Sequence, residues 1–367
     1  MMLWLMNPQL ERLQLLENFS SYIVTKHYFK PSSFELHLPL TEEMLRLIRE
    51  NQLCTGNLMM QSDTEEAYLI EELQPNFEHF GGEIIIKGRD LRAYLERRII
   101  MKEEVQTATP DILIRSWLTE CILSPADSKR RIAQFEMGNL PVFKDKLTIA
   151  LNYQNLLEAM SDLCKITGFG FKVRVNLAMR KLFLDVYQGV DRTGNQTKHT
   201  QAIFSQEFEN ILTQAFTENL MDQKTTAILS YEHDEIKKLL EVSNNEQGLS
   251  RKEIYIDATS SGKGDENHPI SESEQKELVK QEGLETLANY QMIQTMEADV
   301  ITNGNLRYQE DYDLGDKVTV ISEKLGLRLD TRIETIEEVY EQNGREIRLI
   351  FGNKVPTLVD KIKRKVK

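Results

Sequence analysis

The chain has 367 residues, of which 40% are hydrophobic and 28% are charged, with 18 glycines and 9 prolines. These proportions exclude a fibrous or low-complexity chain, and the length indicates two or more packed units because one core rarely grows beyond about 250–300 residues. The formal charge of -13 argues against a surface built to neutralise nucleic-acid phosphates or to lie on anionic lipid.

The first region is predicted to be rich in strands. Alternation of apolar and polar residues predicts strands at residues 21–28, 33–38, 53–60, 66–73 and 83–87, the first two forming a hairpin. Thr41, followed by two glutamates, predicts a capped helix to about Asn51. Gly88 is expected to end the last strand, before a helix that reaches Ile99. We therefore expect a small β-rich barrel or sheet with one helix.

A second unit is expected from Thr109 onward. Residues 109–123 carry apolar side chains at helix intervals, and a longer helix is predicted at Tyr153–Thr167, ending before Gly168. Strands at 169–175 and 181–187 follow this helix. The order predicts helices followed by a hairpin.

The last part of the chain returns to strands. Residues 201–231 are strand-like, although 202–216 also fits a helix. Polar stretches at 242–247 and 260–269 predict surface loops, and the Ser271–Asn289 pattern predicts a capped helix interrupted by Gly283. The remaining strands are expected at 252–257, 291–301, 317–322, 332–340 and 345–351, with an Asn343-Gly344 turn before the last. We see no repeat at the level of sequence.

No constellation for catalysis, for a cofactor or for a metal is found. The three cysteines, Cys54, Cys121 and Cys164, are far apart in apolar settings, so neither a disulfide framework nor a zinc cluster is expected. No metal-ligand spacing occurs among the six histidines, His27, His37, His79, His199, His233 and His268. His37 and His79 are expected to be structural. The Ser261–Asp265 loop lacks the residue order of a phosphate-binding loop.

The run Asp311–Asp316 resembles a calcium loop only superficially. Its glycine comes at the fifth place, and Ser322 stands at the twelfth place, where a bidentate glutamate is required. We therefore expect Gly315 to form a tight turn and Asp316 to enter a strand, so that Gly315→Val costs ~1 kcal/mol or more.

Adjacent carboxylates are candidates for an acid and base pair. Glu71 with Glu72, and Glu337 with Glu338, are the clearest examples. Neighbouring residues of a strand point to opposite faces, so we expect neither pair to address one substrate atom.

Four short motifs occur in a fixed order along the chain. They are Phe34–Leu36; Gly88–Leu91 with Arg97–Ile99; Gly189–Thr193 followed by Phe204–Ile211; and Tyr312–Val318 with Arg332-Ile333. In this order the chain resembles the siphophage tail hub family, whose fold is similar to the baseplate hub of contractile tails. The resemblance runs from about Tyr22 to Gly352. It departs at 217–231, and it implies the hub alone, without the lytic or receptor-binding extension of many relatives.

The resemblance implies an α+β fold with two tube-like β-barrel domains and smaller α/β decorating units. The expected parts are a first barrel at 1–104, a decorating unit at 105–200, a segment at 201–250 that returns to complete the first barrel, a second barrel with a helix at 251–355, and a basic tail at 356–367. Three chains with two similar barrels each would make a pseudo-hexameric ring.

The resemblance also implies a structural role in the virion tail rather than an enzymatic one. The implied partners are two further copies, the distal tail protein, the tape-measure protein and tail-tip or receptor-binding proteins. The protein would be made in the host bacterial cytoplasm without membrane insertion, and genome DNA would pass only as cargo. Acids on barrel strands are candidates for the channel lining, namely Glu66, Glu71, Glu334 and Glu337.

Two alternatives remain open. One is a tail-associated cell-wall hydrolase, which a zymogram would reveal. The other is a host-receptor or carbohydrate-binding module, in which Trp117, Tyr153 and Tyr187 would stack on sugar rings, although core packing is the commoner role of such aromatics.

Overall fold

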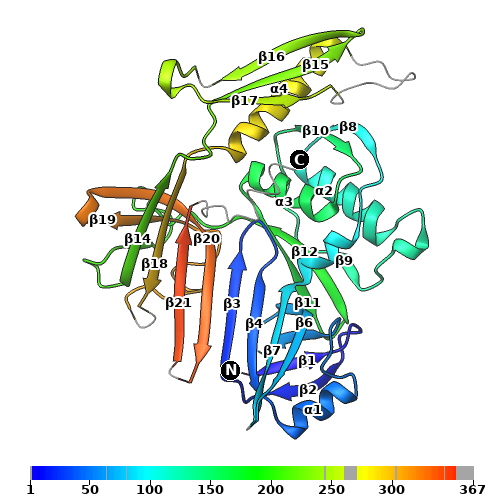
Figure 1. The fold of residues 1–367 in the computed structure, drawn as a ribbon, viewed down its shortest axis with the longest axis vertical. Helices are drawn as coiled ribbons and strands as arrows, with labels where there is room; N and C mark the ends of the chain where they lie inside the picture. The colour runs from blue at the N-terminus through cyan, green and yellow to red at the C-terminus, as the bar shows by residue number, and fades with distance from the viewer. Residues whose placement is uncertain are drawn as a thin grey trace.

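The computed structural model describes residues 2–62, 64–79, 81–243, 245–259, 271–301, 304–342 and 344–352. One long antiparallel sheet runs through the molecule (Figure 1). Its strands, in spatial order, are β14 (Ile211–Asn219), β18 (Ile293–Val300), β21 (Gly344–Phe351), β20 (Leu327–Glu341), β3 (Ser21–His27), β4 (Ser33–Pro39), β7 (Gly82–Asp90), β6 (Ala67–Phe77), β5 (Leu58–Gln61), β1 (Leu3–Met6) and β2 (Arg12–Leu16). A short side branch adds β19 (Lys317–Ser322), which pairs with β20, and β13 (Ile203–Phe204).

The predicted first hairpin is confirmed. β3 and β4 pair antiparallel, and their alternation buries Tyr22, Val24 and Leu36 on one face. Helix α1 (Glu42–Arg49) covers this core, and its predicted cap forms, because Thr41 Oγ1 accepts from the Met44 N–H at 3.3 Å. The alternation of apolar and polar residues therefore places one face of this hairpin in the hydrophobic core, as predicted.

Gly88 does not end its strand, contrary to the prediction. β7 continues through it to Asp90, and a 3-10 helix then spans Leu91–Arg97. A Cβ at Gly88 would lie 1.8 Å from the Leu69 carbonyl oxygen on the neighbouring strand. The glycine is thus required for a close approach of two strands rather than for a break.

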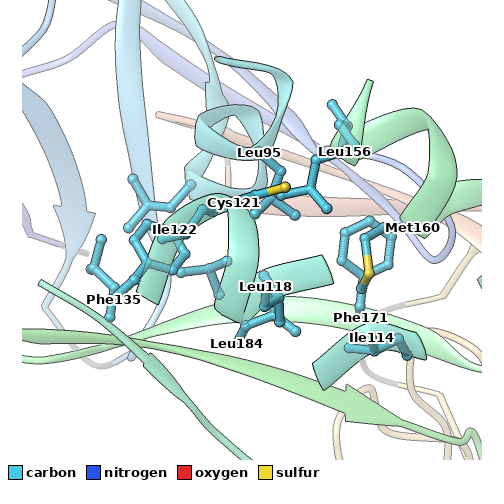
Figure 2. Close-up of a cluster of buried hydrophobic side chains, with 14 of the residues drawn as sticks. Leu95, Ile114, Leu118, Cys121, Ile122, Phe135, Leu156, Met160, Phe171 and Leu184 are labelled. Carbon is cyan, nitrogen blue, oxygen red and sulfur yellow. The ribbon is translucent and has the colours of Figure 1, made fainter. Parts of the chain in front are cut away.

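The α/β unit follows the predicted order of helices and then a hairpin. It contains α2 (Pro110–Leu118), a π-helical turn (Thr119–Leu123), α3 (Leu156–Thr167), β11 (Gly170–Asn176) and β12 (Lys181–Tyr187), with β9 (Phe135–Met137) beside β12 and with β8 (Glu103–Ala108) paired to β10 (Leu147–Asn152). Figure 2 shows its buried core, in which Leu118, Cys121 and Met160 lie among aliphatic and aromatic side chains. Gly168 ends α3 in a left-handed conformation, as predicted.

Residues 201–250 do not pair with the strands of residues 1–104, so the expectation that they complete the first barrel was wrong. β14 pairs instead with β18, a strand from the last part of the chain. β15 (Thr226–His233), β16 (Ile236–Ser243) and β17 (Glu253–Asp257) form a separate sheet against α4 (Glu272–Asn289). A strand-like pattern predicts a strand but does not name its partner, and this is why the error arose.

Two details of this separate unit also differ from expectation. Val242 is a buried residue of β16 rather than the start of a loop. Gly283 does not interrupt α4, because it lies against Leu229 and Val242, where a Cβ would come within 2.8 Å of a Leu229 methyl group. The predicted serine cap is confirmed by the Ser271 and Glu274 capping box.

The two halves of the long sheet share one strand order, although the sequence shows no repeat. If β3, β4, β6 and β7 are numbered one to four along the chain, they lie side by side in the order one, two, four, three. The strands of the other half, β14, β18, β20 and β21, lie in the same order. β20 pairs antiparallel with β3 and joins the halves. Neither half closes, since the described strands form an open path from β14 to β2. The α+β class is supported, but a closed barrel is not formed within one chain.

Candidate functional site

Two motifs that are far apart in the sequence meet beside the joint between the halves. The buried Asp316 carboxylate accepts hydrogen bonds from the Val190 N–H at 2.6 Å, from the Asp313 N–H at 3.0 Å and from Arg192 Nε at 2.9 Å. A Cβ at Gly189 would lie 1.9 Å from the Gly315 carbonyl oxygen. The Gly189–Thr193 and Tyr312–Val318 motifs therefore form one interlocked structural unit.

Tyr28 is the centre of this unit. Its hydroxyl donates to the Tyr187 carbonyl at 3.2 Å and accepts from the Gly189 N–H at 3.1 Å. Gly315 has φ +92°, and a Cβ there would lie 2.1 Å from the Tyr28 ring. The predicted turn at Gly315 is confirmed, and the second reason for glycine, the ring, could not be seen in the sequence.

Calcium is expected to leave the melting temperature unchanged. Within the described ranges, no three His, Cys, Asp or Glu side chains gather as a metal site, and Asp316 is already occupied by N–H donors. Burial raises the pKa of Asp313, which further disfavours the charged form that a cation needs. Thermal melts with millimolar calcium and with a chelator test this prediction, and a marked rise with calcium would contradict it.

A shallow groove of about 520 Å³ lies on the exposed face of β3, β4, β6, β7 and β20. Its charged lining residues are Glu35, Glu71, Glu72, Lys87, Arg89 and Glu337. Most of these charges are paired: Arg89 Nε lies 2.7 Å from Glu71, and Lys87 Nζ lies 2.9 Å from Glu35. The groove is therefore lined largely by charged side chains that neutralise one another across neighbouring strands.

His37 extends this polar surface. Its two ring nitrogens contact Glu35 at 2.8 Å and Glu83 at 2.9 Å. Partial burial lowers the pKa of His37, but the hydrogen bonds with Glu83 and Glu35 outweigh it and raise the pKa above its ordinary value. The predicted structural role of His37 thus takes the form of a bridge between two strands.

Ion pairs continue the surface across the second half of the sheet. Arg348 of β21 lies 2.7 Å from Asp299 of β18 and 3.7 Å from Glu337 of β20. We call this surface the charged face. Its outward charged residues are Glu35, Glu71, Glu72, Glu83, Lys87, Arg89, Glu297, Asp299, Glu337, Glu346 and Arg348. Acids outnumber bases on it, so it is negative with a mixed pattern.

The structure brings together only two of the four acids predicted to line a channel. Glu71 and Glu337 share the groove. Glu66 lies elsewhere, paired at 2.9 Å with the largely buried Lys26. Burial raises the pKa of Glu334, while Arg332 and Lys165 oppose this shift. The register of β20 shifts between Ile333 and Thr335, so Glu334 is the bulge residue and stands outside the regular alternation that places Glu337 in the groove.

The two adjacent carboxylate pairs behave differently. Glu338 faces inward to Lys26 at 3.4 Å while Glu337 lines the groove, as predicted for neighbours in a strand. Glu71 and Glu72 both line the groove, so the prediction of opposite faces was wrong for them. The strand register shifts between Ile70 and Glu72, and this bulge turns both side chains to one face.

The three candidate sugar-stacking aromatics are not gathered on one surface. Trp117 is fully buried and donates from Nε1 to Gln106. Tyr187 packs edge-on against Tyr28, whereas Tyr153 is exposed. The other two free cysteines likewise form no common site with Cys54: Cys121 and Cys164 lie in the core of the α/β unit, whereas Cys54 precedes β5.

Some predicted features fall outside the described residues. These are the Ser261–Asp265 loop, His268, Asn343 of the last hairpin turn and the basic tail. Among the described helices, none combines the length and apolar character needed to cross a membrane.

Known structures share this fold over almost the whole chain. The 43 kDa tail protein of prophage MuSo2 from Shewanella oneidensis superposes with a TM-score of 0.56 and 13% identity, covering 92% of this chain and 95% of that one. A tail protein from Neisseria meningitidis MC58 gives 0.55 and 11%, covering 96% of each. Prophage tail protein gp18 from Listeria monocytogenes EGD-e gives 0.53 and 12%, covering 100% of this chain and 98% of that one.

Sequence comparison leads to one family. No curated protein matches the chain. Residues 1–353 match the family described as Siphovirus ReqiPepy6 Gp37-like protein, which is nearly the full length. The chain therefore belongs to the Siphovirus ReqiPepy6 Gp37-like family of phage proteins.

Proposed function

We propose that this protein is the structural hub of a bacteriophage tail, in which three copies form a ring at the distal end of the tail tube. The observation that carries the proposal is the long sheet, whose two halves repeat one strand order and present one continuous charged face. The shared fold with phage and prophage tail proteins supports the same role. The protein acts by shape and assembly rather than by catalysis.

The doubled sheet suits a change of symmetry. Three chains contribute six halves of equal strand order, so one side of the ring meets a sixfold tube and distal tail ring while the other meets a threefold tip. The barrel that one chain leaves open closes only when copies meet. The tape-measure protein and the tail-tip or receptor-binding proteins are the further partners, and the virion tail is the location.

The chain is expected to form a homotrimer, either alone or together with its tail partners. Three copies are the number that relates a sixfold ring to a threefold tip. Light scattering on the purified chain and on a reconstituted tail tip measures the stoichiometry. A free monomer is compatible with assembly that depends on partners, whereas a strict dimer in both samples would contradict the proposal.

The charged face is expected to line the channel and to let DNA slide. Acids repel phosphates, and each base is already paired, so few counterions would be released on contact. Double-stranded DNA should therefore not be retained by the assembled protein at about 0.1 M salt, a concentration at which the release of counterions from DNA still favours binding to basic surfaces. Tight, salt-sensitive binding would contradict this prediction.

A charge-reversal variant sharpens the DNA test. Changing Glu35, Glu72 and Glu337 to lysine should create salt-dependent DNA binding in the assembled ring, since all three line the groove. The matched control changes Glu42, Glu43 and Glu50 around α1, which alters net charge equally but lies off the charged face. Equal DNA binding by both variants would argue against the assigned lining.

A further inference from the structure

We propose that copies in the ring join edge to edge, with β14 of one copy pairing antiparallel with residues Glu71–Phe77 of β6 in the next. This inference rests on the proposed ring and names the surfaces that close it. The joint between copies repeats, in register, the β20 to β3 joint inside each chain.

The internal joint provides the template. β20 is the third strand of its half in chain order, and β3 is the first strand of the other half. They pair antiparallel from Thr335 opposite His27 to Glu341 opposite Ser21. The corresponding unused strands are β6, third in the first half, and β14, first in the second half. Each chain therefore leaves the edge of one third strand, β6, and of one first strand, β14, available for a joint of the same kind with another copy.

Both unused edges are free along the required length. Glu71–Phe77 pair with β7 on one side only, because β5 reaches β6 no further than Leu69. β14 pairs with β18 on one side, and no described strand pairs with its other side. Unpaired backbone of this kind is a template for strand addition.

Matching irregularities align the two halves residue by residue. β6 shifts register between Ile70 and Glu72, and β20 shifts register between Ile333 and Thr335, each against the last strand of its half. Superposing the bulges places Glu72 on Thr335. Counting on from there places Phe77 on Tyr340.

The first strands align through the second strands. Gly88 and Phe351 lie opposite Ile70 and Ile333, respectively, and they in turn pair with Phe34 and Met296. Phe34 lies opposite Val24, and Met296 lies opposite Phe216, so Phe216 of β14 corresponds to Val24 of β3.

This alignment predicts the register between copies. Replacing each residue of the internal joint by its counterpart gives Glu72 opposite Asn219, Leu73 opposite Glu218, Gln74 opposite Thr217, Pro75 opposite Phe216, Asn76 opposite Ala215 and Phe77 opposite Gln214. No carboxylate faces another carboxylate directly across the joint, although the edges are acidic. Pro75 cannot donate a hydrogen bond, so it suits an edge and removes at most one bond of the new ladder.

An exposed aromatic side chain supports the same register. Phe77 is 69% exposed, yet its counterpart Tyr340 stacks on Tyr22 across the internal joint, with ring centroids 6.0 Å apart. In the proposed joint Phe77 lies diagonally across from Phe216, within reach of an aromatic contact. Burial of Phe77 between copies would remove this apolar side chain from water.

Disulfide trapping tests the register directly. Gln74→Cys with Thr217→Cys, in a Cys54→Ser background, places one thiol on each exposed edge. Inside each chain, the counterpart of this pair is Glu337 opposite Thr25. The Thr25 N–H points toward β4 and away from β20, as does the N–H of His27 two residues on, which donates to Ser32 Oγ at 3.1 Å. Such a pair is the closer, non-hydrogen-bonded kind. Mild oxidation of the purified chain and of reconstituted tail tips should give a covalent trimer on a denaturing gel.

Three controls decide between the outcomes. Gln74→Cys with Thr213→Cys is shifted by four residues, about 13 Å along the strand, and should not link. Either single-cysteine variant would link only if an edge paired with itself, and that result would overturn the proposal. Trimeric tips without a link in the matched pair would also overturn it while leaving the hub function intact. Tips without any trimer would refute the hub function itself.

Discussion

Gly315→Val is expected to lower the free energy of unfolding by about 2–5 kcal/mol. Valine would be strained in the left-handed backbone conformation at this position, and its side chain would overpack the space around it. The backbone at Gly315 has φ +92°, which a β-branched residue adopts only with strain. A Cβ would also lie 2.1 Å from the Tyr28 ring. That ring holds the Gly189 and Tyr187 segments, so its displacement would loosen three parts of the fold.

Gly326→Val separates the two causes. Gly326 has φ +61°, but no heavy atom lies within 4 Å of the position of its missing Cβ. This control should lose only the backbone contribution, about 1–2 kcal/mol. Urea denaturation of both variants gives the comparison. Equal losses would show that the Tyr28 contact does not matter.

Arg92→Met is expected to destabilise the protein by about 3–5 kcal/mol, because it removes one partner of a buried ion pair. Arg92 is 3% exposed and links the first half of the sheet to the α/β unit. It pairs with Asp90 at 2.6 Å and donates to the Phe171 and His27 carbonyls at 2.9 and 3.0 Å. Methionine retains much of the volume but removes the guanidinium donors, so Asp90 loses its cationic partner and keeps only the Ser32 and Arg92 backbone N–H donors.

Arg89→Met is the matched control for Arg92→Met. Arg89 lies three residues earlier and pairs with Glu71 at 2.7 Å and Glu96 at 2.8 Å, but the side chains of these pairs are about one third to one half exposed to solvent. Exposed ion pairs contribute about 0–1 kcal/mol, so this variant should unfold near the wild-type urea concentration. A loss as large as that of Arg92→Met would contradict the assigned burial.

Local patterns predicted most elements of this fold because they depend on near neighbours. The Thr41 and Ser271 caps and Gly168 at the end of α3 all act within one helical turn. Gly88 and Gly283 were misread because each is shaped by a distant contact, with Leu69 and with Leu229. Strand partners also escaped prediction, as β14 shows, since alternation marks a face but not a neighbour.

The candidate surface was only half predictable for the same reason. Glu71 and Glu337 were identified as strand acids, and the structure places both in the groove. Glu66 and Glu334 satisfied the same criterion, but neither lies in the groove. Glu66 turns to an ion pair with Lys26, and Glu334 lies at a bulge. Arg92 gave no signal, because a buried arginine in a short helix reads like any exposed one. The family motif drew attention instead to Arg89, which is only partly buried.

An electron cryomicroscopy reconstruction of the assembled tail tests the central claim most directly. We expect a threefold ring of this chain at the distal end of the tube, with β14 of each copy beside β6 of the next. We also expect Glu35 and Glu337 of the charged face to point into the channel. A chain placed outside the tube wall, or a channel lined mainly by lysine and arginine, would contradict the account.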